Sequence, residues 1–376
     1  MTLRFITTLL LVATPLAAQT ADEPWRDSFY PIVRYSGNDG MSAGLRFAYN
    51  KRGPWEAPYF YAGTFTADLG YSASGSYAAS VRLRAPGLKP GWRFDVSASA
   101  VRQTRYEFYG VGEATPYFAD SVSDSQRYFY RVRRSQLQAR AEGSRRITGR
   151  FWATAMVQAK ETEFSDLPGR SVFTDEFDDT HAESDLITRI GLVYDARNND
   201  YDTHKGALLS VGLLRGTYGE GYDRWVAEAR GWLPFGSWRG TWISARAMAA
   251  AAHGDVPLDS RLYLPHWEGQ ARVLGGAESH RGLRDQRLIG RDHLFGNLTV
   301  HHDLFNAGGL AAGGLIAFVD AGRVFEESKF DLTTEGMEVG VGGGAYLRLM
   351  QTGIYTFNFA NGPDGFVFSL GNNWMF

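Results

Sequence analysis

The sequence contains no cysteine among its 376 residues. Neither a disulfide framework nor a thiolate zinc site is therefore available to the chain. Beyond its first residues, no stretch approaches the ~18 consecutive apolar residues of a membrane-spanning helix, which excludes a helical membrane protein. The formal net charge of -2 shows no excess of basic residues for nucleic acid, so no nucleic-acid partner is predicted.

Residue patterns that would indicate catalysis or a bound cofactor are also missing. No G-x-S-x-G nucleophile elbow occurs. The run Gly340–Ala345 matches G-x-G-x-x-A, but it lies within an alternating strand pattern and not at a strand-to-helix turn. In a strand, His301 and Asp303 share one face while His302 points away, so three convergent metal ligands are not offered. The sequence predicts no enzyme, with no catalytic, cofactor-binding or metal residues.

The first residues have the features of a secretory signal. Arg4 precedes a mainly apolar stretch from Phe5 to Val12, and small residues lead to Ala18 and Gln19. This order predicts a signal peptide over residues 1–18 with cleavage near Ala18. A short buried helix is the alternative, but a polar run follows at once.

Residues of alternating polarity recur along the rest of the chain. Apolar side chains take every second position in residues 41–50, 92–100 and 151–160, and arginine, serine or lysine takes many of the others. Such a period of two indicates strands with one apolar face. An arginine facing lipid at mid-bilayer would cost ~2–4 kcal/mol, so the charged parity is expected to face a lumen. The alternation also explains a mean hydropathy as low as -0.28.

About sixteen such segments can be counted, and an even number is what a closed single-chain barrel requires. They begin near Ser28, Met41, Tyr59, Ser72, Trp92, Arg127, Gly149, Ser184, Gly206, Gly221, Trp238, Asp292, Leu310, Glu335, Gly353 and Gly365. The predicted fold is an all-β, transmembrane antiparallel β-barrel over residues 28–376, preceded by a short segment at 19–27. That segment is far shorter than the ~50 residues of a small domain, so no periplasmic module is expected.

The connections between these segments alternate in length. Those at 86–91, 146–148, 234–237 and 305–309 are short, whereas 106–125, 165–183 and 252–291 are long. Short periplasmic turns and long external loops are typical of outer-membrane barrels. A soluble β-sandwich is the alternative, but its loops should be more even in length.

The final residues are typical of the last strand of an outer-membrane barrel. Phe366, Phe368, Leu370, Trp374 and Phe376 share one parity, which predicts a lipid-facing row interrupted by Asn372. This last strand is expected to pair with the first and to address assembly machinery.

A seam of weak pairing is predicted where the first and last strands meet, marked by Pro31, Asn372 and Phe376. Pro31 removes a hydrogen-bond donor from the first strand and is tolerated at an edge, unless the strand merely begins after it. Asn372 belongs to a run of residues that strands disfavour.

Several motifs resemble conserved sequences of the BamA/TamA superfamily, also called bacterial surface antigens. The run 275–285 holds the pair Arg281-Gly282 and resembles that family's loop motif, with His280 and Leu283 at the flanking positions. The runs 314–325, 194–198 followed by Gly206, and 108–112 resemble three further family motifs. The resemblance covers essentially the whole mature chain.

This resemblance implies a fold, a location and a contact. The long loop would fold into the lumen of a barrel in the outer membrane of a Gram-negative bacterium, and Arg281 would meet Asp320 on a nearby strand. A second acid of the family is replaced by Thr299. Gly282 would need either close backbone approach or positive φ.

Two functions follow from the resemblance and the predicted barrel. The first is insertion or translocation of protein or lipid at the outer membrane with a separate periplasmic partner, and outer-membrane lipid would surround the barrel. The alternative is a passive pore or a structural surface barrel whose lumen is plugged by the loop.

Overall fold

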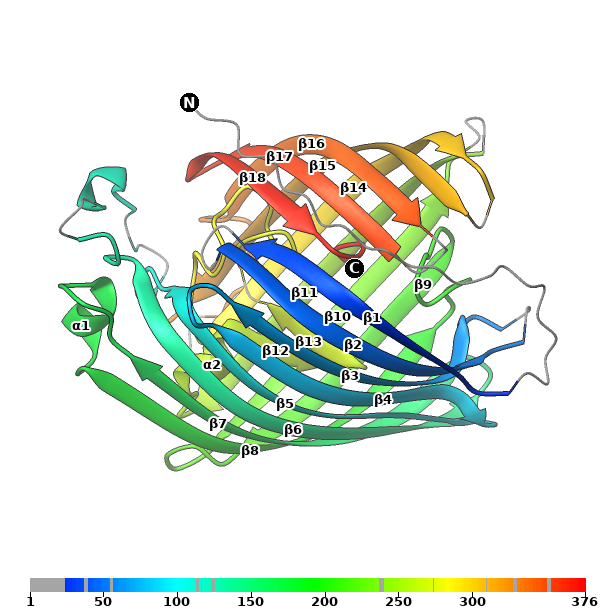
Figure 1. Ribbon diagram of the computed structural model, residues 1–376, viewed down its shortest axis with the longest axis horizontal. Coiled ribbons are helices and arrows are strands. Elements are labelled where there is room, and N and C mark those ends of the chain that lie inside the picture. The colour runs from blue at the N-terminus through cyan, green and yellow to red at the C-terminus, as the bar shows by residue number, and fades with distance from the viewer. Residues whose placement is uncertain are drawn as a thin grey trace. The chain divides into compact units, whose positions relative to one another are not determined.

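The computed structural model describes residues 24–376 apart from 37–39, 55–56, 113–114, 116, 123–125, 237–239, 273, 309, 327–329 and 350–352. The predicted signal peptide at 1–18 and most of the segment at 19–27 lie outside these residues. In the described part, sixteen strands form one antiparallel sheet whose order follows the sequence from β1 to β18, interrupted only by a separate two-stranded sheet (Figure 1). The chain is therefore an all-β protein of sixteen main strands, as the alternation predicts.

The strands of the main sheet are β1 (Arg26–Ser36), β2 (Gly40–Arg52), β3 (Tyr61–Ser72), β4 (Tyr77–Lys89), β5 (Trp92–Glu107), β6 (Arg131–Thr148), β7 (Phe151–Ser165), β8 (Thr180–Asp195), β9 (Gly206–Gly216), β10 (Tyr222–Pro234), β11 (Thr241–Gly254), β14 (Asp292–Asn306), β15 (Ala311–Phe325), β16 (Glu338–Leu349), β17 (Gly353–Gly362) and β18 (Gly365–Gly371). The small sheet pairs β12 (Tyr263–His266) with β13 (Gly269–Arg272), and the helices are η1 (Ala119–Ser121), α1 (Val172–Glu176) and α2 (Leu258–Leu262). Among the described residues, no helix is long and apolar enough to cross a membrane.

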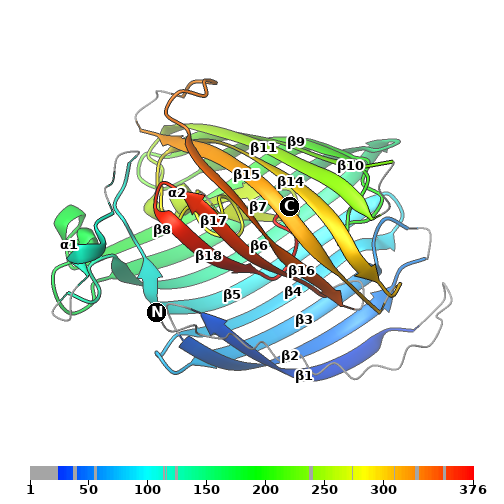
Figure 2. The same ribbon diagram turned by 90° about the horizontal axis from the view of Figure 1, so that it is seen from above.

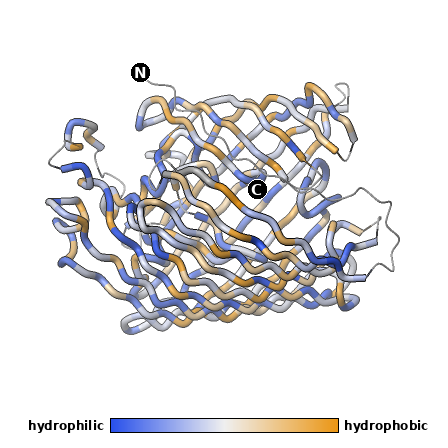
Figure 3. The backbone as a smooth tube through the Cα atoms, in the orientation of Figure 1, coloured by the Kyte–Doolittle hydropathy of each residue, from blue (hydrophilic) through white to orange (hydrophobic). Residues whose placement is uncertain are grey.

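Burial alternates by parity along many of the strands. In β15, Leu315 and Val319 are exposed, whereas Ile316, Phe318 and Asp320 are buried. Hydrophobic and hydrophilic positions accordingly alternate along the strands (Figure 3). Many exposed positions are large and apolar, and many charged or polar side chains are buried, which is the arrangement expected when lipid surrounds the strands.

The fourth strand begins later than the sequence predicts, at Tyr77 and not near Ser72. Ser72 ends β3, and its hydroxyl accepts a hydrogen bond from the backbone nitrogen of Ser76 at 3.1 Å. Gly75 between them has a φ of 90°. The serines and glycine therefore form a turn, because short hydroxyl side chains bond readily to nearby backbone.

By compactness the chain divides into two units. Unit 1 comprises the chain through Phe108 with Ala119–Arg145 and Met156–Leu186, and unit 2 comprises Tyr109–Phe118, Arg146–Ala155 and Ile187–Phe376. The core of unit 1 includes aromatic side chains around α1, with Phe108, Phe164 and Phe177 packed near Phe173.

Unit 2 holds a hydrophobic cluster together with the long loop that follows β11. The cluster consists of Trp152, Val193, Leu208, Trp232, Trp242, Trp267, Ile316, Phe318, Tyr346 and Ala360. Within this unit, β14 to β18 lie side by side in order, as both ribbon views show (Figure 2).

Candidate functional site

The long loop of unit 2 runs from residue 255 to 291, and its Gly275-Gly276 pair begins a compact turn. The backbone nitrogen of His280 donates to the Gly276 carbonyl at 3.1 Å, and that of Gly276 donates to the Leu283 carbonyl at 3.1 Å. Gly275 and Gly276 have φ values of 140° and 85°. A Cβ on Gly275 would lie 2.1 Å from the Arg284 carbonyl oxygen. Positive φ and the lack of room for a Cβ therefore both favour glycine here. The turn that the pair begins places Arg281 at its tip.

Arg281 binds Asp320 of β15 through three hydrogen bonds. Its Nε and Nη2 donate to the two carboxylate oxygens at 2.8 and 2.7 Å, and its backbone nitrogen donates to Oδ2 at 2.8 Å. The two side chains are 4% and 0% exposed. A buried, bidentate pair of this kind is strong in geometry, and each partner without the other would be an uncompensated buried charge. The contact therefore joins the loop to the strand wall.

Neutral side chains of the wall complete the surroundings of this ion pair. Thr299 Oγ1 accepts from Arg281 Nη2 at 2.9 Å. Asn297 Nδ2 donates to Asp320 Oδ1 at 2.9 Å and to the Ser279 carbonyl at 2.6 Å. The Arg281 guanidinium lies 3.5 Å from the centre of the Phe318 ring, within cation-π range. Thr299 thus supplies a hydrogen-bond acceptor at the position where the family resemblance implies a second acid.

Asn297 and Phe318 were not predicted as site residues. Asn297 has the parity of Thr299 in β14, and Phe318 has the parity of Asp320 in β15. Parity places both on the buried face, and it is the signal that could have identified them.

Gly282 is held by close approach and not by positive φ. Its φ lies outside the left-handed region, but an added Cβ would lie 2.6 Å from Gly340 Cα and 3.4 Å from Gly362 Cα. A Cβ on Gly340 or Gly362 would meet Gly282 at 2.8 and 2.3 Å. Loop and wall backbones therefore touch directly at three glycines.

A second attachment holds the end of the same loop. Arg287 Nε donates to Asp364 Oδ1 at 2.8 Å, and the Arg284 backbone nitrogen donates to Asp364 Oδ2 at 3.0 Å. Arg287 also donates to the hydroxyl and carbonyl of Thr115 at 2.8 and 2.6 Å. Since Asp364 lies in the turn between β17 and β18, the loop is tied to the last hairpin of unit 2.

The motif at 194–198 builds a turn between β8 and β9. Arg197 and Asp195 form a two-pronged ion pair with both contacts at 2.9 Å. Asn198 Oδ1 accepts from the backbone nitrogens of His204 and Lys205 at 3.1 Å each. A Cβ on Gly206 would lie 2.2 Å from the Ala196 carbonyl oxygen. The motif residues thus close this turn.

The motif at 108–112 falls at the border of the two units. In unit 1, Phe108 packs on Phe173 with ring centres 5.7 Å apart. In unit 2, Gly112 donates from its backbone nitrogen to the Ile289 carbonyl at 2.7 Å and has a φ of 131°. In unit 2, this end of the motif therefore lies against the end of the long loop.

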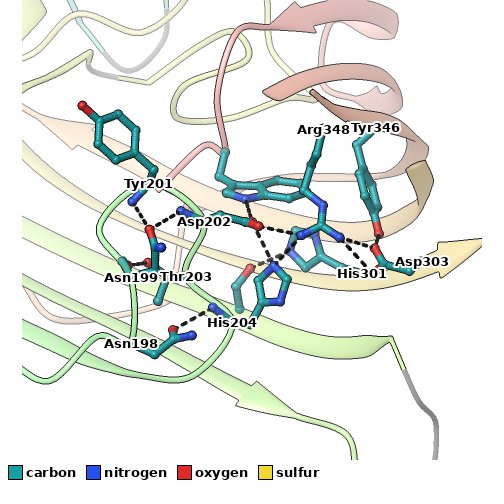
Figure 4. Close-up of polar contacts among 12 residues, drawn as sticks. Asn198, Asn199, Tyr201, Asp202, Thr203, His204, His301, Asp303, Tyr346 and Arg348 are labelled. Atoms are coloured by element: carbon teal, nitrogen blue, oxygen red, sulfur yellow. Dashed lines mark hydrogen bonds and ion pairs between the residues drawn. The ribbon is translucent and has the colours of Figure 1, made fainter. Parts of the chain in front are cut away.

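A second polar cluster, which was not predicted, joins the β8–β9 turn to β14 and β16 (Figure 4). Arg348 donates to Asp202 Oδ2 at 2.6 Å and to both oxygens of Asp303 at 2.9 and 3.0 Å. Tyr346 donates to Asp303, and His204 Nε2 lies 2.8 Å from Asp202 Oδ1. Burial alone would raise the pKa of Asp202, but the hydrogen bond and charge of His204 and the charge of Arg348 lower that pKa to about 2. Asp202 is therefore ionised.

His301 and His302 point to opposite faces of β14. His301 Nε2 lies 2.8 Å from Ser244 Oγ on the buried face, and its ring stacks on Trp242 at 4.6 Å. His302 is exposed and contacts Thr241. His301 and His302 therefore lie on opposite faces, as the period of two along a strand predicts.

The three residues assigned to a seam lie in different settings. Pro31 lies inside β1, five positions after the strand begins at Arg26, so the late-start alternative is wrong. Asn372 lies beyond β18, which ends at Gly371. Phe376 does not continue the exposed row of β18. It packs against the buried cluster of unit 2, 6.4 Å from Trp232 between ring centres. The backbone leaves the strand before the alternating pattern ends.

The model of the Omp85 superfamily domain matches residues 36–374. The chain belongs to the Omp85 superfamily. This agrees with the BamA/TamA-type motifs, and every strand from β2 to β18 lies within the match. A search of curated proteins finds none that matches this Omp85 chain.

Solved structures of BamA and CdiB share the fold. BamA from Haemophilus ducreyi lacking POTRA domains 1–3 matches with a TM-score of 0.58 and 12% identity, over 93% of this chain and 69% of that one. CdiB from Escherichia coli matches at 0.57 and 13%, over 92% and 60%, and CdiB from Acinetobacter baumannii at 0.52 and 11%, over 92% and 58%. The likeness shows a BamA-type β-barrel fold, and this chain spans about three fifths of each CdiB chain.

Proposed function

We propose that this Omp85 barrel lies in the outer membrane of a Gram-negative bacterium and assists the insertion or translocation of protein or lipid. The observation that carries the proposal is the loop 255–291, bound through Arg281 to Asp320 on the buried strand face of a chain of this family. The exposed apolar parity of the strands supports a lipid surround. A loop fixed in this way gives the inside of the barrel a defined surface. A segment of protein or lipid that passes through the barrel can contact this surface.

A separate periplasmic partner is part of the proposal. The alignments leave 31%, 40% and 42% of the three matched structures without a counterpart in this chain. A partner protein would capture a client and deliver it to the barrel. The discriminating experiment is a pull-down of the tagged barrel from outer-membrane extract, followed by identification of stoichiometric periplasmic proteins.

Function is tested directly by reconstitution. Purified barrel in liposomes should accelerate the folding of an unfolded outer-membrane protein, and Arg281→Ala should abolish the acceleration while the variant still shows heat-modifiable migration on gels. Exposed Asp223→Asn is the matched control, because its ion pair with Arg215 is solvent-exposed. Equal acceleration by Arg281→Ala and the unchanged protein would refute the role given to the loop.

The alternative is a passive pore or structural barrel with a plugged lumen. It is favoured by the second attachment, because Arg287 and Asp364 hold the loop in place in addition to Arg281. Conductance across planar bilayers separates the two functions. A plug predicts low conductance that rises when Asp364→Ala and Arg281→Ala are combined, with no effect on client folding at any stage.

Weak pairing at the end strands is the mechanistic part of the proposal. Pro31 offers no backbone donor to a neighbour of β1, and β18 contributes only seven residues to its sheet. Replacing Pro31 with valine restores the donor and should slow client insertion if strand opening limits it. An unchanged rate of client insertion would show that Pro31 has no part in the mechanism.

A further inference from the structure

The residues after β18 turn away from the strand and enter a pocket of unit 2. Continuing the alternation of β18 would place Trp374 and Phe376 with the exposed Phe366 and Phe368. Both are instead partly buried against the hydrophobic cluster that contains Trp232 and Trp242. The pattern of the sequence suits an apolar strand face, whereas the structure places Trp374 and Phe376 in an internal pocket.

Trp374 is recognised through both its ring and its polar atom. Its Nε1 donates to Asp202 Oδ1 at 2.8 Å. The ring packs edge-on against His301, Tyr346 and Trp242, with ring centres 4.8, 5.0 and 5.8 Å apart. A buried indole needs a partner for its N–H and prefers edge-to-face aromatic contacts. The pocket supplies each of these.

The residues that line the Trp374 pocket also contact one another, independently of the segment that occupies it. Asn199 Oδ1 accepts from the backbone nitrogens of Tyr201 and Asp202 at 2.8 and 3.1 Å, which shapes the turn (Figure 4). Arg348 and His204 hold the Asp202 carboxylate from two other directions. His204 also stacks on Trp242 with ring centres 4.0 Å apart. These side chains that line the pocket are therefore held by one another, so the pocket is preorganised for an indole.

Phe376 occupies a second position next to Arg246. The Arg246 guanidinium lies 5.0 Å from the centre of the Phe376 ring, and its Nη1 donates to the Met375 carbonyl at 3.5 Å. The same arginine donates to the Glu278 carbonyl in the long loop at 2.9 Å and to Asn297 at 2.9 Å. Arg246 therefore contacts the segment 372–376, the loop and the strand wall at once.

We propose that unit 2 contains a peptide-binding site for an aromatic Trp-x-Phe segment, and that residues 372–376 of this chain are its reversibly bound ligand. Asp202 selects the indole N–H, the aromatic walls select the ring, and Arg246 binds the backbone and the phenylalanine. Release of the segment would free the pocket and remove one of the contacts that Arg246 makes beside the loop. The proposal does not depend on the client-insertion function.

The chain's lack of cysteine provides a clean reporter for this site. With Met375→Cys as the only thiol, the rate of maleimide labelling measures how often the segment leaves the pocket, relative to an exposed thiol introduced by Thr334→Cys. Trp374→Phe removes the N–H donor and keeps a ring, and Asp202→Asn removes the charge of the acceptor. A lost hydrogen bond to a charged group should raise the labelling rate about tenfold.

The matched control is Asp223→Asn in the same reporter chain, which should leave the rate unchanged. All variants are checked for folding by heat-modifiable migration. A second arm uses the full chain with Trp374→Ala, to which a peptide of residues 371–376 should bind saturably while the same peptide with Trp374→Ala should not. Rapid labelling of the unchanged reporter, equal slow rates in all folded variants, or equal binding of both peptides would overturn the proposal.

Discussion

Both units contain arginine-carboxylate pairs, but the pairs join different parts of the chain. In unit 1, Arg46 and Asp68 are direct partners on the adjacent strands β2 and β3. Asp95 of β5 receives Arg82 from one neighbouring strand and Arg140 from the other. Those pairs reinforce strands that the backbone ladder already holds together.

In unit 2, three arginines bind segments that lie outside the backbone ladder. Arg281 and Arg287 attach the loop to Asp320 and Asp364, and Arg348 attaches the β8–β9 turn to β14 and β16. Removal of the partly exposed Arg46–Asp68 pair should therefore cost little, whereas removal of Arg281 or Arg287 should free a segment. The comparison shows that arginine-carboxylate pairs can reinforce strands already paired in register, as in unit 1, or attach a loop or turn to the strands, as in unit 2.

The largest effect is expected at Arg281 and Asp320. Arg281→Ala or Asp320→Ala should each destabilise unit 2 by about 3–5 kcal/mol, because one charge stays buried without its partner. The double change should cost little more than either single change, since contacting residues are not additive. A double-mutant cycle on urea unfolding, with protease access to residues 255–291, measures both. Strict additivity with a protected loop would show that the pair does not hold the loop.

Gly282→Val should have the next largest effect, because any Cβ there meets the backbones of Gly340 and Gly362. Overpacking of this kind costs about 1–3 kcal/mol. The matched control is Gly231→Val, since a Cβ on Gly231 meets nothing within 4 Å. Protease access to the loop is the readout, and equal protection in both variants would contradict the close approach.

Acid should weaken the cluster around Asp202. Its pKa of about 2 lies below the ordinary value of 3.8, so the ionised carboxylate stabilises the fold above about pH 4 and loses this contribution as the pH falls toward 2. The shift corresponds to about 2 kcal/mol. Unfolding measured between pH 5 and about pH 2 should show this slope, and Asp202→Asn should flatten it. An identical slope in that variant would assign the acid sensitivity to other groups.

The smallest effect is expected in unit 1. Arg46 and Asp68 are 32% and 22% exposed, and pairs with that much solvent contribute about 0–1 kcal/mol. Asp68→Asn should therefore shift the urea midpoint slightly and leave the register of β2 and β3 intact. A loss as large as that of Asp320→Ala would remove the contrast between the units.

The strand pattern could be predicted because it is local. Period-two alternation yields the sixteen strands, and the parity of Asp320 and Thr299 follows from it. The same alternation misplaced Phe376, because a periodic pattern does not show where the backbone leaves the sheet. Asp202, the partner of Trp374, lies 172 residues away in sequence. Arg287 and Asp364 are likewise remote, and only the folded chain brings such pairs together.

The three-glycine contact between the loop and the strands has a consequence for how this loop can vary. Gly282, Gly340 and Gly362 meet main chain to main chain, so at this point the fit depends on the shape of the polypeptide, beside the side-chain contact of Arg281 with Asp320. His280 reaches the wall through an Nε2 contact of 3.0 Å with the Glu338 carbonyl, which is also backbone. Flanking residues can accordingly be exchanged without loss of the docking geometry, and this accounts for a loop that keeps its Arg-Gly centre beside a histidine and a leucine.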